Sequence, residues 1–442
     1  MLSHEEIIQV ISSVNLWGRE QETGLNRPVY LEKLNELSGA KEDTIAIVGL
    51  RRSGKTYLAK QFLKNAAVQT KKEQTLYINF EEPKLDPHLS LPLLDEIYSA
   101  YRTHINREDF AYIVLDEIQN IDKWEKWVRM TQEKHENAKI IITGSSSKLL
   151  SSEFATVLTG RSLKLEVYPG SFREFLSFKG MQLKTGYNIL TKSDDIQRML
   201  PEYLKYGGLP KVILEDNETI KKEFLTEIFE GIIYRDVISR YNIKDTHLVR
   251  IVAELGINYF SSLMSANKLR NTIINIIKRK ISPNLIVDLL NHLENAYLLF
   301  SVPIYSYKIK DQKQYPKKIY CIDTGLINTV SFRFTEDTGK LYENVVAVEL
   351  KRRKKEIYYW KDANHWEVDF VLKDGLKVTQ LIQVCYDTGN PETKNRELKS
   401  LVNAGEEFKC GNLLVITNDY ESEEEFKGEK IKFMPLWKWL IS

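Results

Sequence analysis

The feature that most constrains this chain is an eight-residue segment, Gly49–Thr56, which reads GLRRSGKT. It fits the pattern G-x-x-x-x-G-K-[ST], in which glycines let backbone N–H groups turn towards a phosphate. The segment follows an aliphatic run, Thr44–Val48, and precedes a stretch with helical periodicity. A strand, a glycine loop and a helix in this order predict an α/β domain that binds a nucleotide.

Each polar position of the segment has a chemical part to play. Lys55 places a cation on the β and γ oxygens, and the Thr56 hydroxyl can ligate Mg²⁺. The N-terminus of the following helix also favours anions. We therefore expect ATP and Mg²⁺ as cofactors. The residues of this segment expected to contact the nucleotide are Gly49, Arg51, Arg52, Ser53, Gly54, Lys55, Thr56 and Tyr57.

Further aliphatic runs follow, at Leu76–Phe80, Tyr112–Leu115 and Lys139–Thr143, and they alternate with stretches of helical length. Such runs are typical of buried parallel strands, so a doubly wound α/β domain is predicted. The run at 112–115 ends in Asp116 and Glu117. At this edge Asp116 can orient Mg²⁺ and Glu117 can polarise a water molecule, which favours hydrolysis over nucleotide binding alone.

Polar residues also end the neighbouring strands. Ser145 either contacts the γ-phosphate or belongs to a Gly/Ser turn that caps the next helix. Glu81 and Glu82 face the same edge, as functional groups or as solvated ones. A loose guanine-specificity pattern occurs at Thr191–Asp194, but no D-x-x-G segment accompanies it, so we interpret it as a capping turn and expect ATP.

Composition bounds the rest. The chain has 442 residues with 63 Lys+Arg and 61 Asp+Glu, a net charge of only +2, so nucleic acid could bind only at a local basic patch. The length suggests about three domains. Three scattered cysteines indicate a reduced, cytoplasmic protein without disulfides or structural zinc. Neither a signal peptide nor an apolar run of about 18 residues is found, so we expect no membrane insertion.

Beyond residue 170 the pattern changes. Charged and apolar residues alternate at helical spacing, and helical stretches followed by two short β-like runs then favour a winged helix-turn-helix with Ser282–Asn295 as its last helix. A small mixed α/β pattern follows, in which the acidic run Glu421–Glu425 is interpreted as a solvated loop. The predicted domains are a P-loop core at 1–170, a helical lid or linker at 171–245, a winged helix-turn-helix at 246–335 and a small α/β domain at 336–442.

A series of motifs occurs in a specific order after the phosphate-binding segment. With them, the chain resembles the archaeal and bacterial predicted ATPases of the STAND/AAA+ type, in which an ATPase core precedes a winged helix and a resolvase-like C-terminal domain. The motifs are Leu158–Arg161, Pro169–Phe175, Gly207–Pro210, Tyr234–Asp236 and Leu293–Leu298.

This resemblance implies roles for individual residues. Arg161 is expected to approach the nucleotide phosphates as a catalytic residue, in cis or across the interface of a homo-oligomer. Gly208 and Pro210 resemble the G-x-P element that couples the bound nucleotide to the helical module, with Pro210 near the nucleotide. From the residues alone, Arg161 is an ordinary surface residue and the G-x-P element is a helix-breaking turn.

The C-terminal segments Leu341–Glu343, Glu367–Phe370 and Ile382–Cys385 resemble the PD-(D/E)XK nuclease pattern, giving a restriction-endonuclease-like fold. The resemblance implies Glu343 and Asp369 as metal ligands. Gln383 stands where the pattern has Glu, and Cys385 where it has Lys, so a hard anionic ligand and a stabilising cation are both lost. We expect a degenerate nuclease fold retained for binding or assembly, with weak metal binding and DNA cleavage as the alternative.

The motifs together predict a Mg²⁺-dependent ATPase whose nucleotide state controls how the winged helix and the resolvase-like domain engage DNA or a partner. Two alternatives stay open: a regulatory or defence switch that acts by oligomerisation, and an ATP-regulated DNA nuclease. DNA contact is expected at Lys268–Lys280 or Lys351–Lys355. The residues that could read bases or phosphates from the last helix are Asn291, His292 and Asn295.

Overall fold

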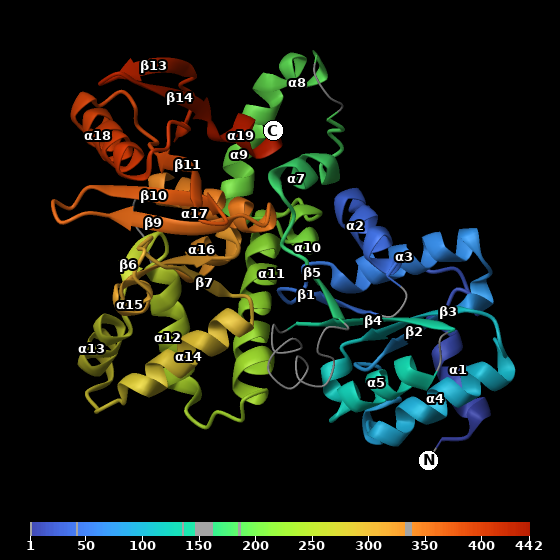
Figure 1. Cartoon of the computed structure of the whole chain (residues 1–442). Coiled ribbons are helices and arrows are strands. Elements are labelled where there is room, and N and C mark those ends of the chain that lie inside the picture. The colour runs from blue at the N-terminus through green and yellow to red at the C-terminus, as the bar shows by residue number, and fades with distance from the viewer. Residues whose placement is uncertain (1, 41–42, 135–136, 146–161, 184–186, 332–337) are drawn as a thin grey trace. The chain divides into compact units, whose positions relative to one another are not determined.

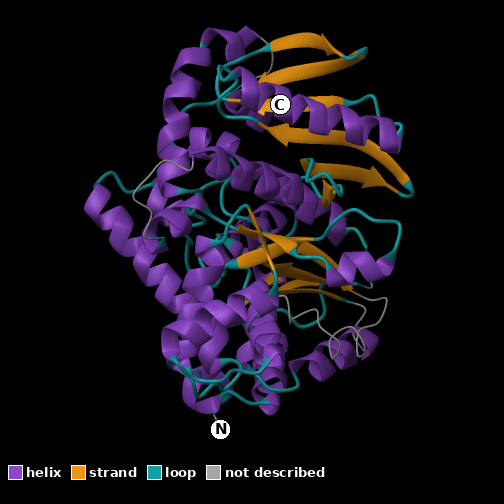
Figure 2. Cartoon of the chain, turned by 90° about the vertical axis from the view of Figure 1, so that its left-hand side faces the viewer, coloured by secondary structure: helices purple, strands orange, loops and turns teal. Residues whose placement is uncertain are grey.

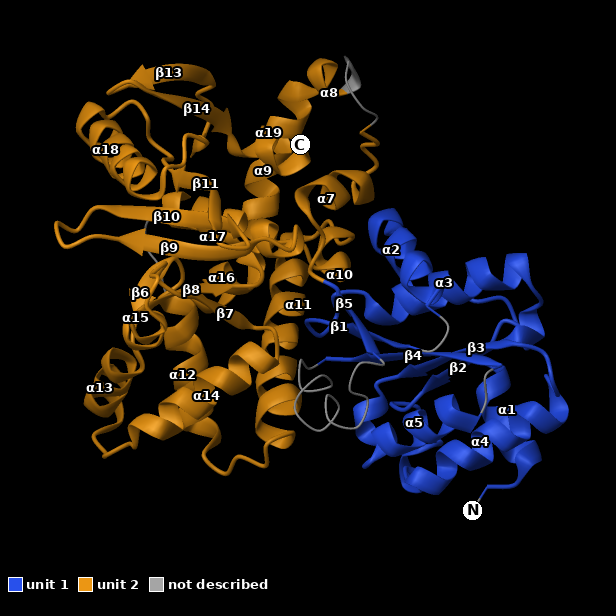
Figure 3. Ribbon diagram, viewed as in Figure 1, with its two compact units in different colours: residues 1–167 blue, residues 168–442 orange. Residues whose placement is uncertain are grey.

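The computed structural model divides the chain into two compact units, residues 1–167 and residues 168–442 (Figure 3). The four-part domain division made from the sequence stays a prediction. None of the described helices is long and apolar enough to cross a membrane. The structure describes residues 2–40, 43–134, 137–145, 162–183, 187–331 and 338–442.

The first unit is built on a parallel five-stranded sheet in the order β2-β3-β4-β1-β5. Helices α2 and α3 cover one face, and α1, α4 and α5 lie on the other (Figure 1). This confirms the predicted parallel α/β sheet. The elements are α1 His4–Ser12, α2 Pro28–Ser38, β1 Thr44–Val48, α3 Lys55–Gln69, η1 Lys72–Gln74, β2 Thr75–Asn79, η2 Asp86–His88, α4 Leu91–His104, β3 Ala111–Asp116, η3 Ile118–Asn120, α5 Trp124–Lys134, β4 Ala138–Gly144 and β5 Ser162–Glu166.

Strand β2 lies at one edge of this sheet, and side chains from the segment after α1 cover its free backbone groups. Asn15 accepts a hydrogen bond from the Tyr77 N–H at 2.7 Å and donates one to the Tyr77 carbonyl at 2.8 Å. The Trp17 indole N–H donates to the Thr75 carbonyl at 3.0 Å. Because an exposed edge can pair with another chain, this cover closes the sheet on that side.

The second unit begins with helices and a π-helix, η5. Helix α7 starts in a capping box, because the Ser171 hydroxyl accepts from the Glu174 N–H and the Glu174 carboxylate accepts from the Ser171 N–H. The elements are α7 Phe172–Phe178, α8 Tyr187–Thr191, α9 Ser193–Tyr206, α10 Pro210–Ile213, α11 Glu218–Gly231 and η5 Ile232–Ser239.

A small antiparallel sheet with the order β6-β8-β7 follows, packed with α12 and α14. Strand β8 corresponds to the run predicted at Lys318–Ile322, but the run predicted at Val302–Ile309 is misplaced, because β7 ends at Val302 and α15 begins at Ile309. The short strand β6 was not predicted. The elements are α12 Thr246–Asn258, β6 Ser262–Met264, α13 Ala266–Ile277, α14 Pro283–Asn295, β7 Leu299–Val302, α15 Ile309–Gln314, β8 Lys317–Cys321 and α16 Thr324–Val330.

The C-terminal part holds a six-stranded mixed sheet in the order β13-β14-β12-β11-β10-β9, and its strands and helices are distinguished in Figure 2. Alternate residues along its strands pack against α17 and α19 on one face and against α18 on the other. The elements are α17 Thr338–Arg352, β9 Glu356–Lys361, β10 Glu367–Asp374, β11 Lys377–Val384, α18 Pro391–Phe408, β12 Leu413–Thr417, β13 Ser422–Phe426, β14 Glu429–Pro435 and α19 Leu436–Ile441.

One expectation about this part is wrong. The acidic run Glu421–Glu425, interpreted as a solvated loop, lies largely in the edge strand β13, which pairs antiparallel with β14. Glu423 stands opposite Lys432 and Glu425 opposite Lys430 in this pairing. Opposite charges on facing positions favour an antiparallel pair. The lysines of β14 therefore offset the charges of the glutamates in β13, an effect that the sequence of the acidic run alone does not show.

Candidate functional site

The phosphate-binding segment forms the loop between β1 and α3. Gly49 has φ +148°, and a Cβ there would lie 2.1 Å from the Val167 carbonyl oxygen, so the close approach of the next chain segment requires glycine. Gly54 has φ +99° and caps α3. The buried Lys55 ammonium donates to the carbonyls of Gly49 at 3.1 Å and Leu50 at 3.0 Å, which places its charge inside the loop.

Asp116 is the centre of a buried hydrogen-bond cluster at the carboxyl end of β3. Its carboxylate accepts from the Thr56 hydroxyl at 2.9 Å and from the Tyr77 hydroxyl at 2.6 Å, and the Thr143 hydroxyl donates to its other oxygen. The Thr143 oxygen also accepts from the Glu117 N–H at 3.1 Å. Side chains from α3, β2 and β4 therefore converge on the carboxylate that was predicted to orient Mg²⁺.

The residues present fit a magnesium ion with a nucleotide. Thr56 and Asp116 bring a hydroxyl and a carboxylate oxygen within 2.9 Å of each other, and hard oxygen ligands are those that Mg²⁺ prefers. The Ser53 hydroxyl is fully buried and has no hydrogen-bond partner among the described residues. Because an unmet buried hydroxyl is costly, its place in the loop indicates a polar ligand there.

Glu117 follows Asp116 in a left-handed backbone conformation with φ 54°. This turn directs the chain away from β3 directly after the carboxylate of Asp116. The Gln119 side-chain amide donates to the Glu117 carboxylate, and the Glu117 residue is only 9% exposed. The predicted catalytic carboxylate thus lies beside the cluster and is held by a hydrogen bond from Gln119.

Other predicted contacts lie around the loop. Arg51 pairs with Glu81 at 3.6 Å, so the acidic end of β2 contacts the phosphate-binding segment. Arg52 adopts φ 62°, and the Tyr57 ring is 48% exposed beside Gly24. Ser145 is fully buried at the end of β4. The structure therefore keeps these residues within the first unit, and their contact with nucleotide stays a prediction.

The family resemblance implies two further residues near the nucleotide, Arg161 and Pro210. Arg161 lies outside the described residues. Pro210 begins α10 in the second unit, so its expected place near the nucleotide stays a prediction.

The family motifs of the second unit do meet one another. The Gly170 N–H donates to the Gly208 carbonyl at 2.6 Å, and the Gly208 N–H donates to the Asp323 carboxylate at 2.7 Å. A Cβ at Gly208 would lie 2.2 Å from the Gly170 carbonyl oxygen, which explains glycine there. Burial raises the pKa of Asp323 to about 6, although backbone N–H groups of Gly208 and Gly325 oppose that shift.

Sequence reasoning missed three residues of the nucleotide site. Tyr77 and Thr143 bind the Asp116 carboxylate, and the buried Arg27 donates to the Ser53 carbonyl at 2.8 Å with its guanidinium 4.3 Å above the Tyr30 ring. A tyrosine in a run of buried residues and an Arg-Pro pair before α2 were the available signals. Both patterns are common in folded proteins, so neither pointed to a site.

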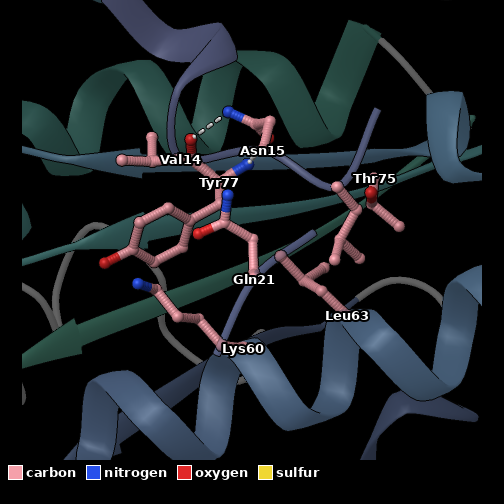
Figure 4. A pocket seen from close by; sticks show the side chains of 8 residues that line it. Val14, Asn15, Gln21, Lys60, Leu63, Thr75 and Tyr77 are labelled. Carbon is pink, nitrogen blue, oxygen red and sulfur yellow. Dashed lines mark hydrogen bonds between the residues drawn. The ribbon is translucent and has the colours of Figure 1, made fainter. Parts of the chain in front are cut away.

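Tyr77 forms one wall of a small hollow between β2 and α3, where the Lys60 ammonium lies 4.9 Å from the centre of its ring (Figure 4). Burial and the Asp116 charge raise the pKa of Tyr77 well above its usual value. The hydroxyl consequently keeps its proton and can act only as a donor to Asp116. Tyr77 is a positioning residue for the expected metal ligand. The hollow is lined by Val14, Asn15, Leu16, Gln21, Lys60, Leu63, Thr75 and Tyr77.

Replacing Tyr77 with Phe should weaken Mg²⁺ binding without preventing it. We expect the Mg²⁺ concentration for half-maximal ATP turnover to rise about 10-fold, because a hydrogen bond to a metal ligand typically contributes that much to metal affinity. The measurement is a Mg²⁺ titration of phosphate release at saturating ATP. Tyr112→Phe, on β3 with its ring against Phe62, is the matched control and should leave the Mg²⁺ dependence unchanged. An equal loss at all Mg²⁺ concentrations would show a purely structural role.

A second cluster gathers the carboxylates of the nuclease-like pattern. Glu343, Glu367 and Asp369 surround the Lys318 ammonium, with N–O distances of 3.1, 2.8 and 2.7 Å. The Tyr320 hydroxyl donates to Glu343 at 2.7 Å. Burial alone would lower the pKa of Lys318, but Asp369 and Glu343 raise it well above its usual value. Burial and the charge of Asp369 raise the pKa of Glu343 to about 8, against the opposing effect of Lys318.

The two departures from the nuclease pattern lie beside this cluster. Gln383 accepts from the Asp369 N–H at 3.2 Å and donates to Glu397 at 2.6 Å, so its amide orients carboxylates through hydrogen bonds. Cys385 is buried, and burial raises the pKa of its thiol to about 11. Among the described residues, no group of three or more His, Cys, Asp and Glu side chains is arranged to hold a metal ion.

Comparison with known proteins shows the family to which the chain belongs. It is 37% identical over 406 residues to the "Uncharacterized protein MJ1544" of Methanocaldococcus jannaschii, covering 90% of this chain and 88% of that one. The chain belongs to the MJ1544 protein family. An uncharacterized protein of Haemophilus influenzae is 29% identical over 421 residues, covering 93% of this chain and 98% of that one.

Domain models match three segments of the chain, and solved structures show remote similarity to it. Residues 41–176 match an AAA domain (AAA_14), and residues 197–337 and 338–439 match two domains of unknown function, DUF8612 and DUF4143. ORC1 of Aeropyrum pernix in complex with DNA is 11% identical, with a TM-score of 0.33 over 75% of this chain and 94% of that one. AMPPCP-bound DnaA of Aquifex aeolicus is 15% identical, with a TM-score of 0.25 over 63% and 91%. The AAA-domain match at 41–176 and the parallel five-stranded sheet give the first unit the AAA-type fold of P-loop ATPases.

Proposed function

We propose that this chain is a Mg²⁺-dependent ATPase whose nucleotide state controls a DNA- or partner-binding module in its second unit. The contact between Thr56 and Asp116 carries the proposal, because it joins the phosphate loop to the acidic end of β3 at 2.9 Å. Lys55 and Glu117 lie next to these two residues in sequence. A phosphate-binding cation, two metal ligands and a base are thus gathered in one place.

Each residue would have a defined task in hydrolysis. Thr56 and Asp116 would hold Mg²⁺, which when bound supplies positive charge to the phosphate oxygens. The Lys55 ammonium and the loop N–H groups bind the β and γ phosphates. The Glu117 carboxylate orients a water molecule and accepts its proton as the water attacks the γ-phosphate. Arg161 is proposed, from the resemblance alone, to neutralise charge that develops on the phosphates.

The arrangement of the second unit supports the identity proposed for its modules. The order α12-β6-α13-α14-β7-α15-β8, with β8 between the other two strands and the short helix α15 in the connection from β7 to β8, supports a winged helix. The order α17-β9-β10-β11-α18-β12, with antiparallel β9 to β11 and parallel β12, supports a PD-(D/E)XK-like fold. A fold of either kind leaves activity open, so the nucleotide site alone carries the enzymatic proposal.

Only part of the expected DNA surface is available. His292 stacks on Tyr241 with ring centres 3.6 Å apart, and Asn295 donates to the same tyrosine hydroxyl at 3.3 Å. Arg352 donates to the Pro169 carbonyl, and Arg353 to that of Trp439. These side chains serve the fold. Arg279 likewise donates to the Asp245 carboxylate. The exposed candidates for phosphate contact are Lys268, Lys278, Lys280, Asn291, Lys354 and Lys355.

The direct test is ATP turnover by the purified chain with and without Mg²⁺. We expect phosphate release that stops when EDTA removes Mg²⁺ and returns when Mg²⁺ is restored. Without the ion, the Thr56 hydroxyl and the Asp116 carboxylate supply no positive charge to the phosphates. Release that continues unchanged in EDTA would contradict the proposal. Addition of branched, duplex and single-stranded nucleic acid at several salt concentrations identifies the partner, since counterion release makes phosphate contacts salt-dependent.

Measurements of protein size and of ATP turnover on the same preparation distinguish an oligomeric switch from the proposed ATPase. A slowly hydrolysed ATP analogue that changes the size of the protein in solution, with little turnover under any condition, favours a regulatory or defence switch. Turnover stimulated by DNA at constant size favours the ATPase that controls a DNA-binding module.

A further inference from the structure

A lysine ammonium occupies the centre of the C-terminal carboxylate cluster. Lys318 is 2% exposed, and its Nζ atom lies 2.7–3.1 Å from oxygens of Glu343, Glu367 and Asp369. Glu367 has a second cation, Lys361, at 3.0 Å. Each of the three carboxylates is therefore paired with a protein cation, as buried charges must be.

These contacts join three elements that are far apart in sequence. Lys318 comes from β8 of the three-stranded sheet, Glu343 from α17, and Glu367 and Asp369 from β10 of the six-stranded sheet. In the PD-(D/E)XK pattern the equivalent helix Glu and strand Asp would hold a divalent metal. Here the ammonium already binds both of those side chains through hydrogen bonds of ordinary length.

A divalent ion could enter only if Lys318 left. The ion would have to bind the same oxygens at about 2.1 Å, in a space that the ammonium fills. Both cations together would repel each other strongly in a buried site. Gln383 cannot replace the lost anionic ligand, because its amide is bonded to the Asp369 backbone and to Glu397.

A separate backbone contact holds the same two sheets together. The Tyr305 N–H donates to the Tyr359 carbonyl at 2.6 Å, and the Tyr359 N–H donates to the Pro303 carbonyl at 3.1 Å. The segment after β7 thus extends the six-stranded sheet beyond its edge strand β9. The ammonium cluster and this backbone pairing both connect the three-stranded sheet to the six-stranded sheet.

We propose that Lys318 is the resident cation of this carboxylate site, in place of a divalent metal, and that the site fastens the three-stranded sheet to the C-terminal domain. The C-terminal domain is then a nuclease-like fold without metal-dependent cleavage. Its acidic site serves assembly, and the two sheets move as one body. This inference does not depend on ATP hydrolysis, so each can fail without the other.

The test measures Mn²⁺ binding and thermal unfolding of the full-length, nucleotide-free chain. Lys318→Met should gain one Mn²⁺ site per chain relative to wild type, detected by loss of the free-ion electron paramagnetic resonance signal. Without Mn²⁺ this variant should unfold roughly 10 °C lower, because three buried carboxylates lose their shared partner, and Mn²⁺ should restore part of the loss. Lys317→Met, the exposed neighbour on β8, is the control and should match wild type in both measurements.

Two results would overturn the inference. One is a Lys318→Met protein that equals Lys317→Met in stability and in Mn²⁺ binding. The other comes from proteins with Lys318 intact: a Mn²⁺ site in wild type that Glu343→Gln abolishes, or Mn²⁺-dependent DNA cleavage lost in the same variant. If Lys318→Met does not fold, the comparison of wild type with Glu343→Gln tests the inference instead. Equal Mn²⁺ binding by these two proteins, without DNA cleavage, supports the inference.

Discussion

Lys55→Ala is expected to remove ATP turnover almost completely. The Lys55 ammonium is buried inside the phosphate loop, within 3.1 Å of two loop carbonyl oxygens. Its removal leaves the loop N–H groups to bind the phosphates without a fixed positive charge. Loss of one preorganised electrostatic group of this kind costs about 10²- to 10³-fold in rate, and we expect at least that loss in phosphate release at saturating Mg²⁺ and ATP.

The control for this variant lies on the same helix. Lys64 is exposed on α3, so Lys64→Ala removes one positive charge from the same element without touching the loop. We expect the control to hydrolyse ATP at the wild-type rate. ATP hydrolysis at the wild-type rate in Lys55→Ala would refute the assignment of the phosphate site.

The nucleotide site was largely predictable because its signals are local. The Gly49–Thr56 loop needs glycines at two backbone positions, and Gly49 and Gly54 both have positive φ angles in the structure. The buried parallel strands are aliphatic runs, and their carboxyl ends meet at one sheet edge. The sequence alone therefore places Asp116 and Glu117 beside the loop. Tyr77 and Thr143, which donate to Asp116, could not be placed there, since they differ little in sequence context from ordinary core residues.

Lys318 shows why the C-terminal site could not be predicted in the same way. It follows Lys317 in a lysine-rich segment, a pattern that indicates a basic surface. On β8 the two side chains point to opposite faces, so Lys317 is exposed and Lys318 is buried. Its carboxylate partners come 25 to 51 residues later in the chain. Only the tertiary structure brings Lys318 and these carboxylates together. The side chains that the sequence predicted as metal ligands therefore form ion pairs with Lys318.

Glu117→Gln should separate nucleotide binding from hydrolysis. The substitution keeps the size of the side chain and its contact with Gln119 but removes the base, so we expect turnover to fall about 10²- to 10⁴-fold. ATP binding should persist, because Lys55, Thr56 and Asp116 are unchanged. Equilibrium binding of a fluorescent ATP analogue and phosphate release measure the two properties on one preparation.

The comparison that gives this result its meaning is Asp122→Asn, an exposed carboxylate in the same connection between β3 and α5. That variant should bind and hydrolyse ATP as wild type does. If Glu117→Gln loses binding and hydrolysis to the same degree, Glu117 supports the left-handed turn after Asp116 and does not act as the base. If only hydrolysis is lost, the proton acceptor is the carboxylate, because the amide preserves the other contacts of the turn.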